Sequence, residues 1–156
     1  MIKTSVTILF AQLPIFIIIL LFLTLDTIVN PISYLINISG HISIIFLFVT
    51  LLSSRIIFLK EKLDRRVLGL ASFFYLIAHM IFYFIDNNFI LEYIVDDLIS
   101  LSFIQVGYFA FVLYLPLVFS SSSKAKIILG KLWSSIHKLI YLILAISLIH
   151  YYQVIK

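Results

Sequence analysis

The chain has 156 residues, of which 63% are hydrophobic and 12% charged, with a formal net charge of +4 at pH 7. A soluble domain carries about 25% charged residues and is about half apolar, so this composition indicates a membrane protein. The sequence has no cysteine, which excludes disulfides, thiolate zinc sites, iron–sulfur clusters and a C-x-x-C-H haem attachment.

Five stretches are long and apolar enough to span a bilayer, which takes about 20 helical residues. They are residues 6–25, 41–59, 67–85, 98–119 and 133–152. The first is longer than the apolar region of an ordinary signal peptide and no A-x-A cleavage site follows it, so we expect it to be a retained spanning helix. Pro14 and Pro116 lie inside two stretches, where membrane bundles tolerate them. The fold class predicted is all-α, a polytopic membrane helical bundle forming a single domain over residues 1–156.

The basic residues predict the orientation of these helices in the membrane. Ten of the eleven Lys and Arg residues are Lys3 or lie within residues 55–66 and 124–138, and only Lys156 falls on the other side. The acidic residues of the opposite side are Asp26, Asp86, Glu92, Asp96 and Asp97. We therefore expect a cytoplasmic N-terminus, a periplasmic C-terminus and a multi-pass location in the cell inner membrane. The pair Asp96–Asp97 is expected in a solvated outer loop, and nucleic acid is not an expected partner.

Three histidines lie inside or at the ends of predicted spans: His79, His137 and His150. An ionisable side chain is costly in the bilayer and marks a functional site. With no cysteine, imidazole is the obvious strong ligand for a transition metal or haem iron, so we predict a non-covalent haem b. Each histidine also has a structural interpretation. His79 could bond between helices, His150 could join an interfacial aromatic belt, and His137 could face lipid headgroups.

Depth in the membrane ranks the possible pairs of ligands. His79 and His150 differ by about five residues, or ~8 Å, whereas His79 and His137 differ by about eight residues, or ~12 Å. Depth favours His79 with His150, although helix tilt could reverse this. In a straight helix His137 and His150 would face sides ~220° apart, so either two haem sites exist or one of them binds something else. His41 is expected to be structural, although its depth would suit a partner of His150.

The residues around these histidines form recognisable motifs. Residues 65–79 are RRVLGLASFFYLIAH, residues 129–142 are LGKLWSSIHKLIYL, and residues 148–151 are LIHY. Asn30-Pro31 precedes Ser39-Gly40, and Val106-Gly107 precedes Leu115-Pro116-Leu117. Over nearly the whole chain these motifs resemble the MsrQ family (also called YedZ) of the ferric-reductase-like transmembrane superfamily. Two features depart from the family. Its T-P-x-R motif is replaced by Ser53-Ser54-Arg55, and a helix that often follows the last histidine is not part of this sequence.

The resemblance implies haem b and an FMN as cofactors, with His79, His137 and His150 as ligands of the haem iron. It implies an electron-transfer subunit supplied by a cytoplasmic flavin reductase or a membrane quinone. The acceptor would be a periplasmic, molybdenum-containing MsrP-like reductase that repairs methionine sulfoxide in proteins, so catalysis is expected on the partner and no catalytic residue is assigned. Two alternatives stay open. One is a ferric-chelate or other metalloreductase of the same superfamily, and the other is a haem-free membrane scaffold or transporter subunit.

Overall fold

The computed structural model describes residues 2–23 and 29–156, and the regular structure in these residues is entirely helical. Five described helical segments are long and apolar enough to cross a membrane, which confirms the predicted fold class. The chain divides into two compact units, Met1–Ile90 and Leu91–Lys156. The single domain expected over residues 1–156 stays a prediction, and so does the side of the membrane on which each terminus lies.

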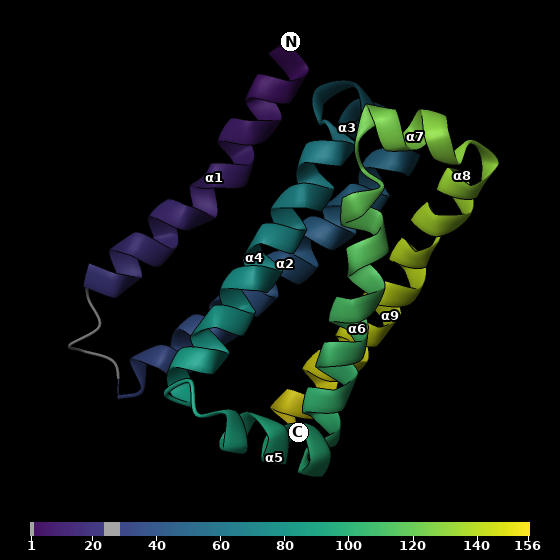
Figure 1. Ribbon diagram of the computed structural model, residues 1–156. Coiled ribbons are helices and arrows are strands. Elements are labelled where there is room, and N and C mark those ends of the chain that lie inside the picture. Colours follow the sequence, from purple (N-terminus) through teal and green to yellow (C-terminus); the bar gives the residue numbers. More distant parts are fainter. Residues whose placement is uncertain (1, 24–28) are drawn as a thin grey trace. The chain divides into compact units, whose positions relative to one another are not determined.

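The first unit contains α1 (Ile2–Leu23), α2 (Pro31–Arg55), the short α3 (Ile57–Lys62) and α4 (Arg65–Asp86) (Figure 1). α2 begins well before the expected residue 41, because the Asn30 side chain accepts a hydrogen bond from the backbone N–H of Ser33 at 3.1 Å. Such a cap, followed by proline at the first helical position, is a strong helix start. The expected end of the first span at residue 25 and the acidic Asp26 lie outside the described residues.

α2 and α4 pack antiparallel along their lengths, and α1 and α3 contact this pair. The core between them is formed by four side chains: Ile42, Phe46, Leu68 and Tyr75. Two buried serines approach each other across the same interface. The Ser43 hydroxyl donates to the Ser72 carbonyl at 2.9 Å, and the Ser72 hydroxyl donates to the Ser43 carbonyl at 2.7 Å. Small residues and interhelical hydrogen bonds are what hold helices together in lipid, so this pairing suits a membrane bundle.

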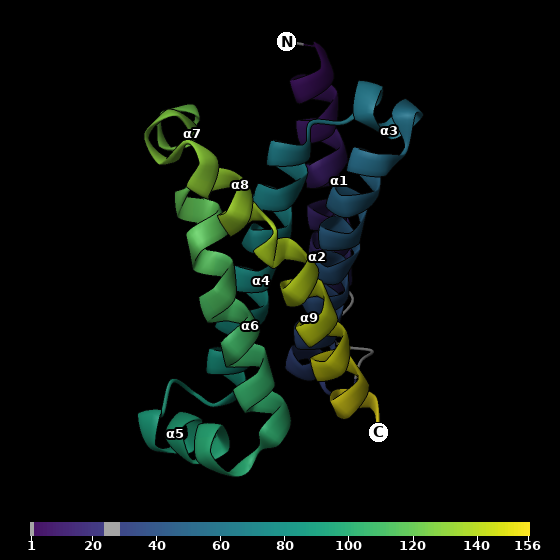
Figure 2. The same ribbon diagram turned by 90° about the vertical axis from the view of Figure 1, so that its right-hand side faces the viewer.

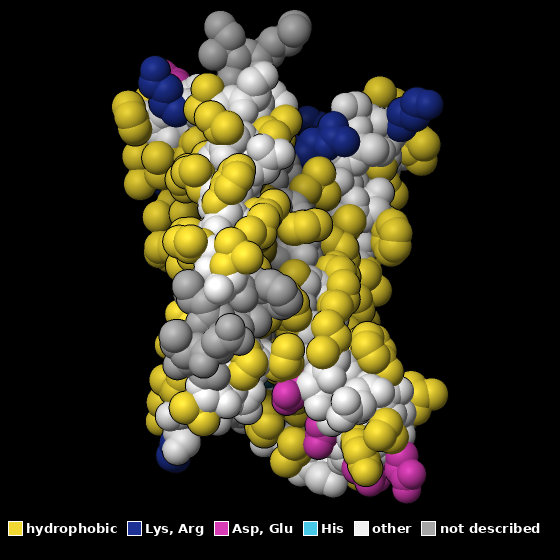
Figure 3. Space-filling model, turned by 90° about the vertical axis from the view of Figure 1, so that its left-hand side faces the viewer, with side chains coloured by type: hydrophobic (Ala, Val, Ile, Leu, Met, Phe, Trp, Pro, Cys, Tyr) yellow, Lys and Arg dark blue, Asp and Glu magenta, His cyan; other side chains and the backbone are white. Residues whose placement is uncertain are grey.

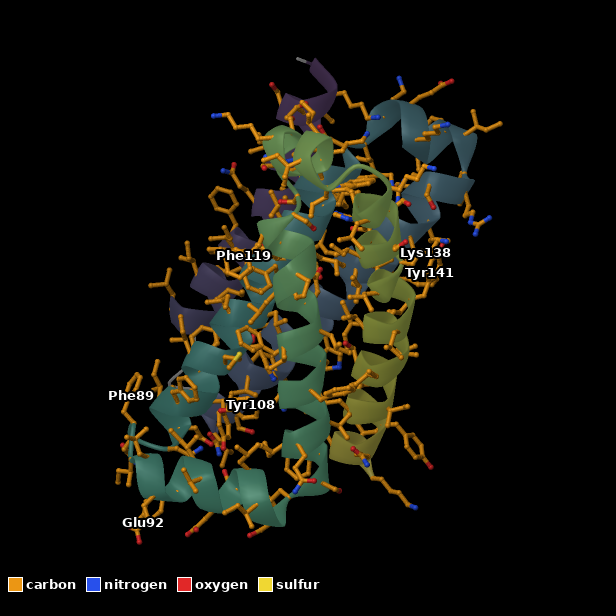
Figure 4. All side chains as sticks on the ribbon, turned by 45° about the vertical axis from the view of Figure 1, so that its right-hand side comes forward. Phe89, Glu92, Tyr108, Phe119, Lys138 and Tyr141 are labelled. Carbon is orange, nitrogen blue, oxygen red and sulfur yellow. The ribbon has the colours of Figure 1, made fainter. Side chains whose placement is uncertain are left out.

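The second unit contains α5 (Leu91–Ser100), α6 (Ser102–Phe119), α7 (Ser123–Leu129), α8 (Lys131–His137) and α9 (Leu139–Ile155) (Figure 2). α6 and α9 pack against each other. The span expected at 98–119 begins at Ser102, because Leu101 has extended backbone angles (φ −107°, ψ 108°). The span expected at 133–152 is interrupted at Lys138, where α8 ends and α9 begins. Lys138 and Tyr141 are labelled at this break in Figure 4.

The acidic pair Asp96–Asp97 lies in a helix, not in the expected loop. Both residues belong to α5 together with Glu92, and no residue of this helix is buried. Figure 4 shows Glu92 on α5, and Figure 3 shows acidic side chains gathered at one end of the face that it presents. Apolar side chains cover the long helices between their ends (Figure 3), as expected for helices that contact lipid.

Candidate functional site

His79 lies on α4 at its contact with α2. The ring Nδ1–H donates to the carbonyl oxygen of Ile36 at 2.8 Å. Gly40, one helical turn after Ile36, lies directly against the ring. A Cβ atom at Gly40 would be 3.0 Å from Nδ1 of His79 and 3.2 Å from Cε1. The partly buried imidazole therefore lies with its Nδ1 edge against a backbone carbonyl and a glycine of the neighbouring helix.

His150 has an equivalent environment in the second unit, on α9 at its contact with α6. Its Nδ1–H donates to the carbonyl oxygen of Phe103 at 2.7 Å. Gly107 follows Phe103 by one turn, and a Cβ atom there would be 3.0 Å from Cε1 and 3.1 Å from Nδ1 of His150. Both units thus use the same local arrangement: a carbonyl, a glycine one turn later, and a histidine from the paired helix.

These hydrogen bonds determine which ring nitrogen can bind a metal. A carbonyl oxygen only accepts, so Nδ1 of each ring carries the proton and the lone pair of the neutral imidazole is on Nε2. Histidines that ligate metals commonly donate their other N–H to a carbonyl, which fixes the tautomer and the ring orientation. The hydrogen bond from His79 to Ile36 is the interhelical bond that the structural interpretation of His79 predicts. Because it uses Nδ1, it is compatible with iron ligation through Nε2.

His137 is oriented by its own part of the chain. Its Nδ1–H donates to the carbonyl oxygen of Trp133, one turn earlier, at 3.0 Å. The two rings are stacked with centroids 4.0 Å apart and planes 26° from parallel. The Trp133 indole N–H donates to the carbonyl of Ser120 at 2.9 Å, and the Lys126 ammonium lies 5.0 Å from the centre of the indole ring. His137 therefore shares the Nδ1–carbonyl bond of the other two histidines, but its acceptor lies on its own helix and not on a paired one.

His41 occupies a different position from the other three. It is exposed on α2, although its neighbour Gly40 lies against His79. Within residues 2–23 and 29–156 no three His, Asp or Glu side chains gather in a group that could hold a metal ion. A haem iron takes its remaining ligands from the porphyrin and needs only axial side chains from the protein. The oriented rings of His79, His137 and His150 fit that requirement.

The sequence did not reveal the atoms that orient these rings. The sequence places Gly40 and Gly107 in motifs but does not indicate a role for them. Glycine inside a helix is destabilising relative to alanine, so a glycine within a spanning helix was a usable signal. The carbonyl groups of Ile36 and Phe103 had no such signal, because every residue has one.

Comparisons with known proteins support a redox role. The family model described as "Ferric reductase like transmembrane component" matches residues 39–148. The chain is 35% identical over 130 residues to the protein-methionine-sulfoxide reductase heme-binding subunit MsrQ of Herminiimonas arsenicoxydans, covering 79% of this chain and 59% of that protein. It is 36% identical over 93 residues to the subunit of the same name from Brucella ovis, covering 59% of this chain and 42% of that protein. The chain thus spans less than two thirds of the length of these relatives. No solved structure gives a significant match.

Proposed function

The chain belongs to the family of ferric reductase like transmembrane components, and on this basis we propose that it is a haem b electron-transfer subunit of a methionine sulfoxide reductase system. The resemblance to MsrQ proteins found in the sequence is confirmed by the similar subunits. The five candidate spanning segments and the family together make it a multi-pass membrane redox subunit. The ligands, the electron path and the partners are the proposed part.

The observation that carries the proposal is the equivalent orientation of His79 and His150. Each ring donates Nδ1–H to a carbonyl of the paired helix, at 2.8 and 2.7 Å. We propose that each of these two histidines would ligate the iron of a haem b through Nε2. When bound, the haem supplies a reversible one-electron change at iron. The carbonyl bonds keep Nε2 unprotonated, fix the ring planes and raise the basicity of the ligands.

His137 is the third proposed ligand, and its environment differs from the other two. Its ring is held by Trp133 on the same short helix. The spacing of His137 and His150 in the sequence leaves two alternatives open: two haem sites, or a second role for one of these histidines. We propose that His137 serves a second haem, and the haem content of a His137 variant decides between the two alternatives.

The proposed electron path crosses the inner membrane. The donor is a cytoplasmic flavin reductase or a membrane quinone, and the acceptor is a periplasmic, molybdenum-containing MsrP-like reductase. Support comes from the name of the similar subunits, which places them in a protein-methionine-sulfoxide reductase. The distribution of basic and acidic residues supports the orientation. An FMN is part of the proposal through the family resemblance alone.

A second candidate function is reduction of a ferric chelate or another small metal complex. The description of the matching family model favours it. The two functions share the haem ligands and differ only in the acceptor. Reoxidation of the reduced protein by each acceptor separates the two functions. Reoxidation by a methionine sulfoxide reductase with its substrate, and not by ferric chelates, would favour the role in methionine sulfoxide reduction.

The haem-to-protein ratio of the purified full chain, expressed with ample haem, tests the ligand assignment. We expect the wild type to show the Soret and alpha bands of bis-histidine haem. His79→Ala and His150→Ala should each lose this low-spin signature, because one axial ligand is removed. His137→Ala should lower the haem content without removing that signature.

His41→Ala is the matched control, since its ring is exposed on α2, and it should behave as the wild type. Circular dichroism and gel filtration would verify that each variant keeps its helices and size. A wild-type protein without haem, or a folded His79→Ala variant with full low-spin haem, would overturn the assignment.

A further inference from the structure

We propose that Gly40 and Gly107 are positioning residues, which set the planes of the His79 and His150 rings by allowing each imidazole to lie directly on the backbone of the paired helix. This inference rests on the proposed haem ligation by these histidines. It adds to that proposal the two residues that determine the ring orientation.

The carbonyl and the glycine of the paired helix limit the space along one edge of each ring. The His79 ring bonds to the Ile36 carbonyl at 2.8 Å, and a methyl group at Gly40 would lie 3.0 Å from the same nitrogen. Uncharged heavy atoms attract each other best at separations of about 3.5–4.0 Å, and closer atoms repel each other. A side chain at this position therefore pushes on Nδ1, the atom whose hydrogen bond fixes the orientation of Nε2.

The same constraint acts on His150. The ring bonds to the Phe103 carbonyl at 2.7 Å, and a methyl group at Gly107 would lie 3.0 Å from Cε1, 3.1 Å from Nδ1 and 3.5 Å from Nε2. An imidazole is rigid and moves only by rotation about two side-chain bonds, so it cannot yield locally as the end of a long side chain does. The ring must turn, or the hydrogen bond to the carbonyl must lengthen.

The repetition of this arrangement argues that it serves the histidines. Residues four apart lie on the same face of a helix, so the carbonyl and the glycine present one continuous surface to the ring in each unit. Close packing of two helices does not in general require a glycine with so little space beside it. Gly69 lies on α4 in the same helix pair, and a Cβ atom there would meet Cγ2 of Thr50 at 3.9 Å, which is ordinary contact.

Three alanine variants of the full chain test the inference: Gly40→Ala, Gly107→Ala and the matched control Gly69→Ala. Changes to groups that orient a metal-ligating histidine typically lower metal affinity by about 10–100-fold. We expect a loss of haem affinity of this order for the first two variants. The haem that remains should shift from low-spin to high-spin in absorption and electron paramagnetic resonance spectra. Added imidazole should restore the low-spin spectrum, because it replaces the misdirected ligand. Gly69→Ala should match the wild type.

The direction of the effect separates positioning from helix stability. Alanine is a better helix former than glycine, so a weakened helix is not an explanation for lost ligation, and circular dichroism should show unchanged helix content. Wild-type spectra for both Gly40→Ala and Gly107→Ala would overturn the inference. It is overturned equally if Gly69→Ala causes the same loss, or if imidazole restores nothing.

These outcomes are distinct from a failure of the proposed function. If the wild type binds haem and His79→Ala loses it, while the two glycine variants are unchanged, only the positioning role is wrong. If the wild type binds no haem, the ligand assignment fails, and the positioning role fails with it.

Discussion

Replacing Ser43 and Ser72 with alanine, singly and together, should measure how strongly α2 holds α4. Both residues are buried, and each hydroxyl donates to the carbonyl of the other residue, at 2.9 and 2.7 Å. An interhelical hydrogen bond in a membrane protein contributes ~0.6 kcal/mol on average, so each single variant should lose about that free energy of unfolding and the double variant ~1.2 kcal/mol. The two hydroxyl oxygens are 3.4 Å apart, too far for a strong mutual bond. The two effects should therefore be nearly additive.

The free energy of unfolding can be measured for the full chain in mixed micelles, by titration with sodium dodecyl sulfate and detection by circular dichroism. Ser134→Ala is the matched control, because its exposed hydroxyl donates to the carbonyl of Lys131 in its own helix. It should leave the midpoint unchanged. A double variant as stable as the wild type would refute the argument that the serines hold the helices together. A coupling energy above ~1 kcal/mol would refute the reasoning from geometry, since it would mean that the hydroxyls act on each other.

Two further substitutions probe single contacts. The Tyr75 hydroxyl donates to the carbonyl of Ala11 at 2.8 Å and joins α4 to α1, so Tyr75→Phe should lower the free energy of unfolding by ~0.6 to ~1.7 kcal/mol in the same titration; no change would show that this bond does not hold α1. Trp133→Phe removes the indole bond to Ser120 and keeps an aromatic ring beside His137. It should lower the free energy of unfolding by ~1 kcal/mol and leave the low-spin haem spectrum intact. A loss of that spectrum would contradict the separate orientation of His137.

The spanning segments could be predicted because lipid imposes a simple rule on sequence. A helix must present about 20 apolar residues to cross the bilayer, and each predicted span overlaps a described helix. The ends were less predictable. Residues 98–102 are Leu-Ile-Ser-Leu-Ser, and their apolar character continues across the extended residue Leu101 that separates α5 from α6. The early start of α2 depends on the cap at Asn30, a local signal that hydropathy does not contain.

The candidate site was predictable as a set of residue types and not as a geometry. Histidines in an apolar chain without cysteine pointed to haem, because a buried ionisable group needs a partner. The register of α2 against α4 could not be predicted from the sequence, because the bond from His79 to Ile36 joins residues 43 apart in the chain. The partner atom is also a backbone carbonyl, which has no residue-specific signature. The role of Gly40 follows only once this register is known.

The observed break in the last span also changes how His137 and His150 relate to each other. The prediction that the two rings face different sides assumes one straight helix, in which thirteen residues turn the chain by ~220° net. The backbone N–H of Lys138 bonds to Ser135, and that of Tyr141 bonds to Lys138, where α8 gives way to α9. The straight-helix angle therefore does not apply across this segment. Each ring takes its orientation from its own acceptor, Trp133 for His137 and Phe103 of α6 for His150. A substitution that turns one ring should for this reason leave the other ring in place. The two histidines can therefore bind separate groups although they lie on one segment of the chain.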